Sequence, residues 1–416
     1  MKEFDTQLPN ASVIRAAMRE TTNRLAAELA APTDSAPEWD SFEWRVAMAV
    51  SVMHGISGLL AGRLRWRGEP AWQSFLADQL THSRQREQHT RTLLARLDTA
   101  AREARVALVA LKGSALLELG IYKPGERPMS DVDLLVRPTE FDAANALILN
   151  LGFAAGVSSW KHRDYLPLDT PAERGFGEHA DNPVKIELHA RLPERLPVRE
   201  IDIAAQVFPD DAGTGLNAYP SIAALMRHLL LHAAGNLCGG AIRLIQIHDI
   251  AALAARLTDA DWQEALAEAS DGLPAWWAAP PFALVQRLFP DHIPTTPCAM
   301  KRAVSACPPF LRASLGRQDL NDVSASRFAI RMLPGLAWSH TTAEAWACAR
   351  QRLLPDREAE ATTRLQVQSH HAHASSAWTH QPRWLKALRF LGGAPPRVQA
   401  IYNLHGALAY RPSSSA

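Results

Sequence analysis

Two aspartates separated by one residue form the most informative chemical pattern of the sequence. Asp131 and Asp133 open a short apolar segment, residues 131–136, and in a strand they would share one face while Val132 lies on the other. Two neighbouring carboxylates repel each other, and burying an unpaired one is costly. A divalent cation removes this repulsion, and Mg²⁺ favours one or two carboxylates together with phosphate oxygens. The pattern therefore predicts a metal and phosphate site, whereas a merely solvated strand end does not explain the spacing.

A third acid, Glu187, lies on a strand predicted within residues 184–192, with Lys185 and His189 on the same face. If this strand lies beside the Asp131 strand, three carboxylates and two metal ions would meet, an arrangement that supports in-line attack at a phosphorus atom. We predict that Glu187 binds metal or acts as a base, with an exposed strand residue as the alternative. His189 either contacts the ligand and relays a proton, or hydrogen-bonds to the acids and positions them.

A strand, a Gly-Ser turn and a short helix precede the aspartates, at residues 106–119. Gly113 lets the backbone approach a phosphate closely, and Ser114 adds a hydroxyl donor at a helix N-terminus. Lys112 stands just before this turn and either reaches the ligand or points to the rim of the sheet. The segment predicts a phosphate-binding turn, with an ordinary helix start as the alternative.

Two more polar residues lie in the loop before Asp131. Arg127 either grips a phosphate or pairs with a carboxylate in a structural role. Ser130 either contacts the nucleotide or caps a turn by bonding to Asp131. Both are therefore candidates for the same binding site.

This succession of motifs resembles a known superfamily. Gly113 and Ser114, then Asp131 and Asp133, then a strand with a third acid resemble the nucleotidyltransferases of the DNA polymerase β type. The strings "LVALKGSALLELGIY", "SDVDLLVRP" and "KIELHARL" resemble more closely the family described as uncharacterised nucleotidyltransferase. The flanking strings "VMHGISGLLAGRL" and "MRHLLLHAAG" are similar to its upstream and downstream helices. The resemblance implies that Gly113 and Ser114 hold a nucleoside triphosphate, that the two aspartates bind metal, and that Glu187 binds metal or acts as base.

The interval between Ser114 and Asp131 is longer than in the simplest polymerase β-like motif. We therefore expect the loop at residues 120–129 to touch substrate.

Apolar periodicity predicts the elements that position these residues. The fold class is α+β, with a small mixed-sheet nucleotidyltransferase core flanked by helical regions. Between the helix that follows the aspartates and the strand of Glu187, residues 158–183 are expected to form a hairpin or a lid. Helices are predicted at residues 11–30, 41–66 and 72–104, and the three regions are 1–100 (helical), 101–200 (core) and 201–416 (helical, with an exposed loop near 366–383).

Composition limits the classes of protein. The chain has 416 residues, 47% of them hydrophobic, and a net charge of +1, so no basic field favours nucleic acid or an anionic membrane. The start lacks the apolar segment of a signal peptide, and no uncharged apolar stretch is long enough for a membrane span. We expect a cytoplasmic protein with reduced thiols, because its cysteines form neither a zinc motif nor a disulfide framework: Cys238, Cys298, Cys307 and Cys348.

Several histidines and tryptophans have less specific patterns. His228 and His232 are four residues apart on one predicted helix face, but without a third ligand we expect them to pack at the core rim. A metal site is equally disfavoured for the histidines of the predicted loop, which are His370, His371, His373 and His380. Trp276 and Trp277 are expected in the core or in an apolar contact patch.

We therefore expect an enzyme that moves a nucleoside monophosphate from an NTP to a hydroxyl or phosphate of a small molecule or peptide, releasing pyrophosphate. Two Mg²⁺ ions, with Mn²⁺ as an alternative, would be its cofactors. One alternative is a protein- or RNA-modifying nucleotidyltransferase or toxin, and another is a non-catalytic nucleotide-binding scaffold. The sequence identifies neither the base, nor the acceptor, nor the oligomeric state.

Overall fold

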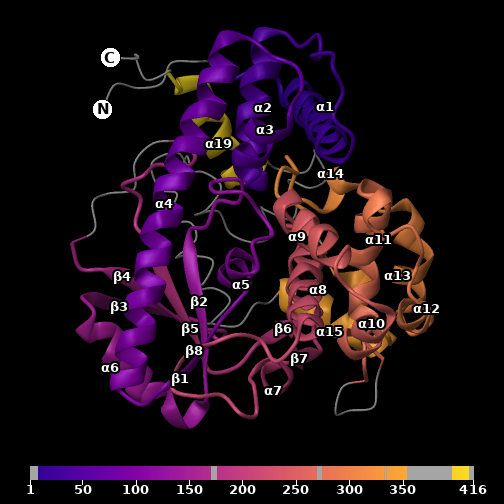
Figure 1. Ribbon diagram of the computed structural model, residues 1–416. Helices are drawn as coiled ribbons and strands as arrows, with labels where there is room; N and C mark the ends of the chain where they lie inside the picture. The colour runs from indigo at the N-terminus through magenta and orange to yellow at the C-terminus, as the bar shows by residue number, and fades with distance from the viewer. Residues whose placement is uncertain are drawn as a thin grey trace.

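The computed structural model describes residues 8–169, 176–268, 274–331, 333, 335–353 and 396–411. An N-terminal helical layer leads into one very long helix, which runs beside the sheet (Figure 1). The break between the second and third helices occurs at Gly55, whose φ of 65° ends the helix and which the predicted single helix 41–66 did not anticipate. These helices are α1 (Ala11–Ala30), α2 (Ser41–His54), α3 (Ser57–Arg63) and α4 (Pro70–Glu103).

The α/β core that follows contains a six-stranded mixed sheet in the order β3-β4-β5-β2-β1-β8. Strands β2 and β5 are parallel, as are β1 and β8, and the remaining neighbours are antiparallel. The strands are β1 (Ala107–Ala110), β2 (Asp131–Val136), β3 (Phe153–Ser158), β4 (Arg163–Pro167), β5 (Lys185–His189) and β8 (Gly215–Asn217). The connecting elements are α5 (Gly113–Glu118), η1 (Pro138–Glu140), α6 (Phe141–Asn150), β6 (Pro193–Arg195), β7 (Glu200–Asp202) and α7 (Ala204–Val207).

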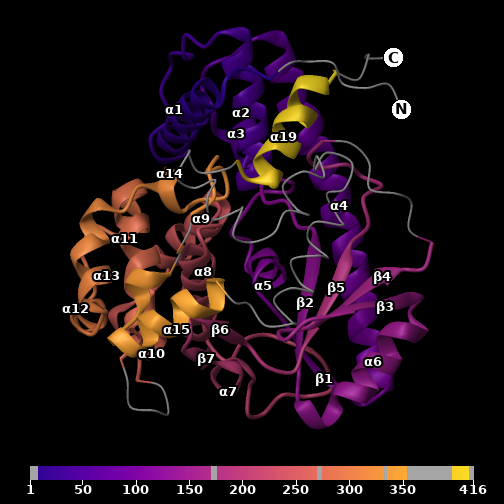
Figure 2. The ribbon, with the colours of Figure 1, turned by 180° about the vertical axis from the view of Figure 1, so that it is seen from behind.

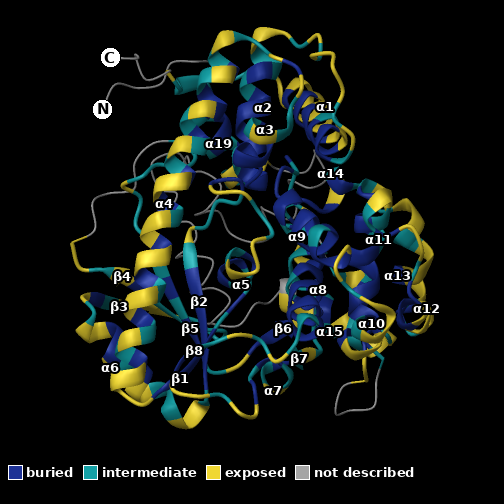
Figure 3. Cartoon of the chain, viewed as in Figure 1, coloured by how far each residue is buried: buried dark blue, intermediate teal, exposed yellow. Residues whose placement is uncertain are grey.

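The two faces of the sheet carry different side chains because strand residues alternate. Val132 and Leu134 are buried in a cluster with residues of α4 and α6. Leu135, one position out of phase, belongs to a second cluster that includes α5 and the later helices. The aspartates of β2 share the face of Leu135 and so point away from α4 and α6. Figures 1 and 3 show α4 on one side of β2 and α5 on the other.

Helices then form the opposite half of the molecule and return to the N-terminal layer. The C-terminal helix α19 (Val398–Ala409) packs against α2, as the view from behind shows (Figure 2). The preceding helices are α8 (Ile222–Gly239), α9 (Leu244–Ala254), α10 (Asp259–Ala265), α11 (Ala279–Leu288), α12 (Cys298–Ser305), α13 (Pro309–Ser314), α14 (Leu320–Val323) and α15 (Thr342–Leu353). Short 3₁₀ turns lie at η2 (Trp276–Ala278), η3 (Pro290–His292), η4 (Leu315–Arg317) and η5 (Leu336–Trp338).

The structure confirms the predicted α+β fold with a mixed sheet. The segment expected as a hairpin or lid contains the turn and the second strand of the β3–β4 hairpin, whose first strand begins earlier, at Phe153. The three-residue strand β8, which follows position 200 in the chain, also pairs with β1 in the sheet, so the sheet extends past the boundary expected at residue 200. Trp276 and Trp277 are buried as expected. The predicted loop near 366–383, with its four histidines, lies outside the described residues.

None of the described helices alone has the length and hydropathy of a membrane span. The bent pair α2 and α3, which meet at 114°, passes that test together by length and composition.

Candidate active site

Acidic residues form a row across three neighbouring strands. Asp133 of β2 is in register with Glu187 of β5, which is in turn in register with Asp164 of β4. Residues in register share a face of the sheet, so these three side chains emerge on one side. Asp131 lies on the same face, two residues before Asp133. The structure thus brings together the three acids expected from sequence and adds a fourth.

A cavity of about 240 Å³ lies in front of this row, and we call it the acid cavity. It combines the acids with the cationic side chains of Lys112, Arg127 and Arg243. Its lining residues are Lys112, Gly113, Arg127, Pro128, Met129, Ser130, Asp131, Asp133, Glu187, Leu229, His232, Arg243, Ile245, Gln246 and Asp249. The presence of both negative and positive groups suits a ligand that is itself anionic and carries a cation.

Lys112 is the cation in direct contact with the acids. Its Nζ lies 2.7 Å from Oδ1 of Asp133, and its backbone adopts φ 46° and ψ −110°, an uncommon conformation for a residue with a Cβ. The Lys112 N–H donates to the Tyr219 hydroxyl at 3.1 Å, and that hydroxyl lies 2.7 Å from Nδ1 of His228. Tyr219 and His228 therefore hold the strained turn that aims Lys112 at Asp133.

The acids differ in the ease with which they ionise. Burial favours the neutral form of Asp133, but Lys112 and His189 outweigh it and hold the pKa of Asp133 well below its usual range. Burial and the charge of Asp133 raise the pKa of Asp131. Burial, then Asp133 and Asp131, raise the pKa of Glu187 to about 9. Lys112 alone therefore does not neutralise the acidic row. An added cation would stabilise the ionised form of these carboxyl groups.

Gly113 and Ser114 face different cavities. A Cβ on Gly113 would lie 2.5 Å from Nη1 of Arg127 and 2.7 Å from Sδ of Met129, so the absence of a side chain lets these two residues of the acid cavity approach the turn. The left-handed backbone of this turn belongs to Lys112 and not to the glycine. Ser114 lines a separate cavity of about 660 Å³ between α4, α5 and α8. Its hydroxyl is buried there without a hydrogen-bond partner among the described residues.

Arg127 and Ser130 both line the acid cavity and both have local partners. Arg127 donates from Nε and Nη2 to the two carboxylate oxygens of Asp249, at 2.9 and 2.8 Å. This bidentate pair fixes the plane of the guanidinium group. Ser130 hydrogen-bonds to Asp131 and favours its charged form. The pairing with a carboxylate, expected as one role of Arg127, is thus observed. A phosphate contact through the remaining edge of its guanidinium group stays a prediction.

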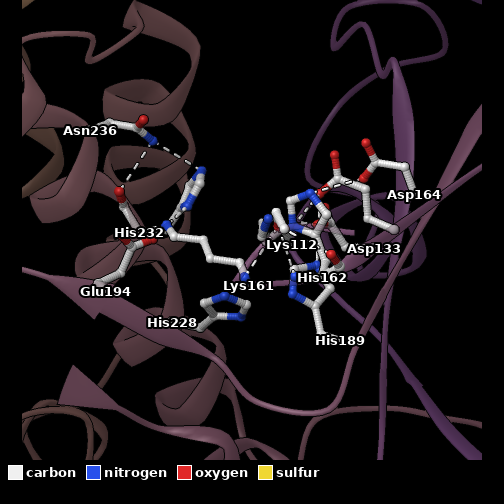
Figure 4. A network of polar contacts seen from close by, with 12 residues as sticks. Lys112, Asp133, Lys161, His162, Asp164, His189, Glu194, His228, His232 and Asn236 are labelled. Atoms are coloured by element: carbon white, nitrogen blue, oxygen red, sulfur yellow. Dashed lines mark hydrogen bonds and ion pairs between the residues drawn. The ribbon is translucent and has the colours of Figure 1, made fainter. Parts of the chain in front are cut away.

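A second cavity, of about 150 Å³, lies on the other side of Glu187, and we call it the histidine cavity. Lys112 and Glu187 line both cavities, whereas His189 lines only the second. Figure 4 shows the polar side chains of the histidine cavity in two clusters, one that includes Asp133 and one that includes Glu194. Its lining residues are Lys112, Lys161, His162, Glu187, His189, Leu192, Pro193, Glu194, His228, Leu231 and His232.

The histidines of this cavity have distinct partners. His189 Nε2 lies 3.1 Å from Oδ1 of Asp133, and burial lowers the pKa of His189 to about 4 although Asp133 opposes this. His232 lies 3.4 Å from Glu194, which also pairs with Lys161 at 2.7 Å. His228 and His232 therefore have protein partners of their own at the core rim.

Sequence reasoning missed several residues of the site. His162 and Asp164 alternate on β4 and its preceding turn, a His-x-Asp pattern that could have been noticed beside the Asp-x-Asp of β2. Arg243 gave no such signal, because it reaches the acid cavity from the start of α9.

A comparison with known protein families identifies the general activity of the protein that carries this acidic site. The profile of a family described as uncharacterised nucleotidyltransferase matches residues 40–289, more than half of the chain. The chain belongs to this family. It is therefore a nucleotidyltransferase, and the matched residues include the whole six-stranded sheet and both cavities. Neither the curated proteins nor the solved structures contain a significant match.

Proposed function

We propose that this nucleotidyltransferase moves a nucleoside monophosphate from an NTP to a hydroxyl or phosphate of a small molecule or peptide, and releases pyrophosphate. One observation carries the proposal: Asp131, Asp133 and Glu187 share one sheet face and line the same cavity as Lys112 and two arginines. A triphosphate that carries divalent cations matches both kinds of charge in this cavity.

The donor set fits Mg²⁺. Carboxylate oxygens are the ligands that this hard cation prefers. Burial and then the neighbouring acids raise the pKa values of Asp131 and Glu187, so an added cation would favour their ionised forms. Asp131, Asp133 and Glu187 would hold the metal, with Mn²⁺ as an alternative. When bound, it would supply electrostatic stabilisation at the α-phosphoryl group and acidify the acceptor hydroxyl.

The protein's own groups would bind and orient the substrates. Arg127, fixed by Asp249, and Arg243 face the acid cavity and would contact phosphate oxygens. Gly113 would leave the space that the triphosphate needs. Lys112 would neutralise charge that develops on the phosphates, because its ammonium remains protonated: Asp133 and Glu187 raise its pKa despite its burial.

Glu187 would bind the metal or, as the alternative, receive the proton of the acceptor hydroxyl. It lies between the acid cavity, where the NTP would bind, and the histidine cavity, where we place the acceptor. In the metal-free protein its pKa of about 9 keeps it protonated at neutral pH, whereas a cation bound at Asp131 and Asp133 would favour the ionised form that can accept a proton. Lys161, Glu194 and His232 would then give the acceptor site mixed polar contacts. These groups favour a small polar molecule or a peptide side chain.

The test is transfer of label from each of the four NTPs, labelled at the α-phosphate, to a mixture of small metabolites and peptides with Mg²⁺. Chromatography and mass spectrometry would identify the labelled product and the released pyrophosphate. The parent protein should form a labelled acceptor and the Asp131→Asn variant should not. Equal product from both proteins would contradict the proposed site.

A further inference from the structure

Glu187 has a second group of metal-compatible neighbours on the side away from Asp131. Its Oε2 lies 3.5 Å from Nδ1 of His162 and 3.8 Å from Nε2 of His189. Among the described residues, these three form the group of metal-ligand type whose donor atoms all lie within 4.8 Å of one another. A metal about 2.1 Å from each of two ligands keeps them within about 4.2 Å. The two measured separations meet that condition.

One buried polar atom beside Glu187 lacks a hydrogen bond. It is Nδ1 of His162, which has no hydrogen-bond partner among the described residues. Buried polar atoms are nearly always paired, and an exception calls for a specific cause such as a bound ion. The Nδ1 atom faces Oε2 of Glu187, which is where an ion shared by the two residues would lie.

Asp164 is placed to orient the His162 ring. It is in register with Glu187, and its Oδ1 lies 2.9 Å from Nε2 of His162. Imidazoles that bind metal through one nitrogen commonly have a carboxylate behind the other, which fixes the ring and its tautomer. The antiparallel strands β4 and β5 carry Asp164, Glu187 and His189, and His162 lies in the turn just before β4.

We propose that His162, Glu187 and His189 form a binding site for a divalent transition metal such as Mn²⁺, Co²⁺ or Zn²⁺, with Asp164 as the residue that positions His162. Two imidazole nitrogens and one carboxylate favour these ions over Mg²⁺, whose ligands are almost all oxygens. The site shares Glu187 with the proposed magnesium site. It does not depend on nucleotide transfer.

Binding requires one local change. In the metal-free protein, Nε2 of His189 faces Oδ1 of Asp133 at 3.1 Å. To bind metal, this nitrogen must present its lone pair, so the neutral ring must carry its proton on Nδ1. The ion then replaces the hydrogen bond to Asp133, and the Lys112 contact at 2.7 Å remains to balance that carboxylate.

Cobalt is a suitable probe, because nitrogen ligation of Co²⁺ changes its visible absorption. The full-length protein, freed of metal with a chelator, would be titrated with Co²⁺ by absorption spectroscopy and calorimetry. We expect one bound ion and a spectrum typical of imidazole ligands. His162→Ala should weaken binding by at least about tenfold, and Asp164→Asn by about 10- to 100-fold.

Two controls locate the ion. His89→Ala removes an exposed histidine on α4 and should bind Co²⁺ like the parent. Asp131→Asn removes an oxygen ligand of the proposed magnesium site and should also keep the cobalt spectrum. Thermal melting would verify that each variant is folded.

The outcomes are distinct. If the parent protein bound no Co²⁺ at about 100 μM, the proposed site would be overturned. Its binding free energy for Co²⁺ would then be weaker than about −5.5 kcal/mol. Equal affinity for Co²⁺ in the parent, His162→Ala and Asp164→Asn would also overturn the site. Loss of Co²⁺ binding in Asp131→Asn alone would overturn it as well. Cobalt binding without any binding of NTP would support this site while contradicting the proposed function.

Discussion

At the scale of single residues, the two aspartates of β2 differ in their partners. Asp133 contacts Lys112 at 2.7 Å and His189 at 3.1 Å, whereas burial and Asp133 raise the pKa of Asp131. Asp133→Asn should therefore lower the free energy of unfolding, by on the order of 3 kcal/mol, because a buried ammonium loses its counter-charge. Asp131→Asn should leave it unchanged or raise it, because one of two repelling charges is removed.

Urea denaturation of both variants in EDTA, compared with the parent, measures this difference. Equal destabilisation by the two substitutions would contradict the assignment of Lys112 and His189 to Asp133.

Glu187 should make the stability of the metal-free protein depend on pH. Its pKa is raised from 4.5 to about 9 in the folded state, so between these values the folded protein binds the extra proton. The contribution of Glu187 to stability is then complete below the lower value and is lost as the pH rises toward the upper one. In EDTA, the Tm of the parent should fall more steeply from about pH 5 to about pH 8 than the Tm of Glu187→Gln. Parallel curves for the two proteins would rule out this titration.

At the scale of elements, the turn between β1 and α5 separates two side chains that are adjacent in sequence. Gly113→Val would place atoms against Arg127 and Met129 in the acid cavity, whereas Ser114→Ala changes only the separate cavity beside α4. We expect Gly113→Val to weaken binding of a non-hydrolysable NTP with Mg²⁺ by about 10- to 150-fold, the equivalent of one lost hydrogen bond to a charged group.

Ser114→Ala should bind this ligand like the parent, and calorimetric titration of both variants gives the comparison. Nucleotide affinity that falls with Ser114→Ala and not with Gly113→Val would place the phosphates on the other side of α5.

Sequence patterns predicted the elements whose periodicity is strong. Helix α4 carries regularly spaced apolar positions and strand β2 is a short apolar run. The alternation of side chains along any strand then predicted that Asp131 and Asp133 share a face. The partners of β2 could not be predicted, because register depends on contacts between distant segments. For the same reason, Asp164 joined the acidic row only once β4 was seen to pair with β5. Strand β8, with three residues, is too short to show any period.

At the scale of the whole molecule, the last helix closes the N-terminal layer. Leu404 of α19 is fully buried, and the Tyr410 hydroxyl donates to Asp78 of α4 at 2.7 Å. Leu404→Ala should therefore lower the free energy of unfolding by about 2–5 kcal/mol, the usual cost of such a cavity in a core. The exposed Gln399 on the same helix gives the matched control, because Gln399→Ala should change stability by less than about 0.5 kcal/mol.

Urea denaturation gives the midpoint for each protein. Equal midpoints for Leu404→Ala and Gln399→Ala would show that α19 does not contribute to the common core.

The most direct test of the account is calorimetric titration of non-hydrolysable analogues of the four NTPs into the folded protein, with Mg²⁺ and with EDTA. The account predicts that at least one analogue binds the parent in Mg²⁺, and that binding is lost in EDTA and in Asp131→Asn, while Ser114→Ala retains it. Binding that is equally strong in EDTA, or in Asp131→Asn, would contradict the claim that the acidic row of β2 and β5 holds a metal-bound nucleotide.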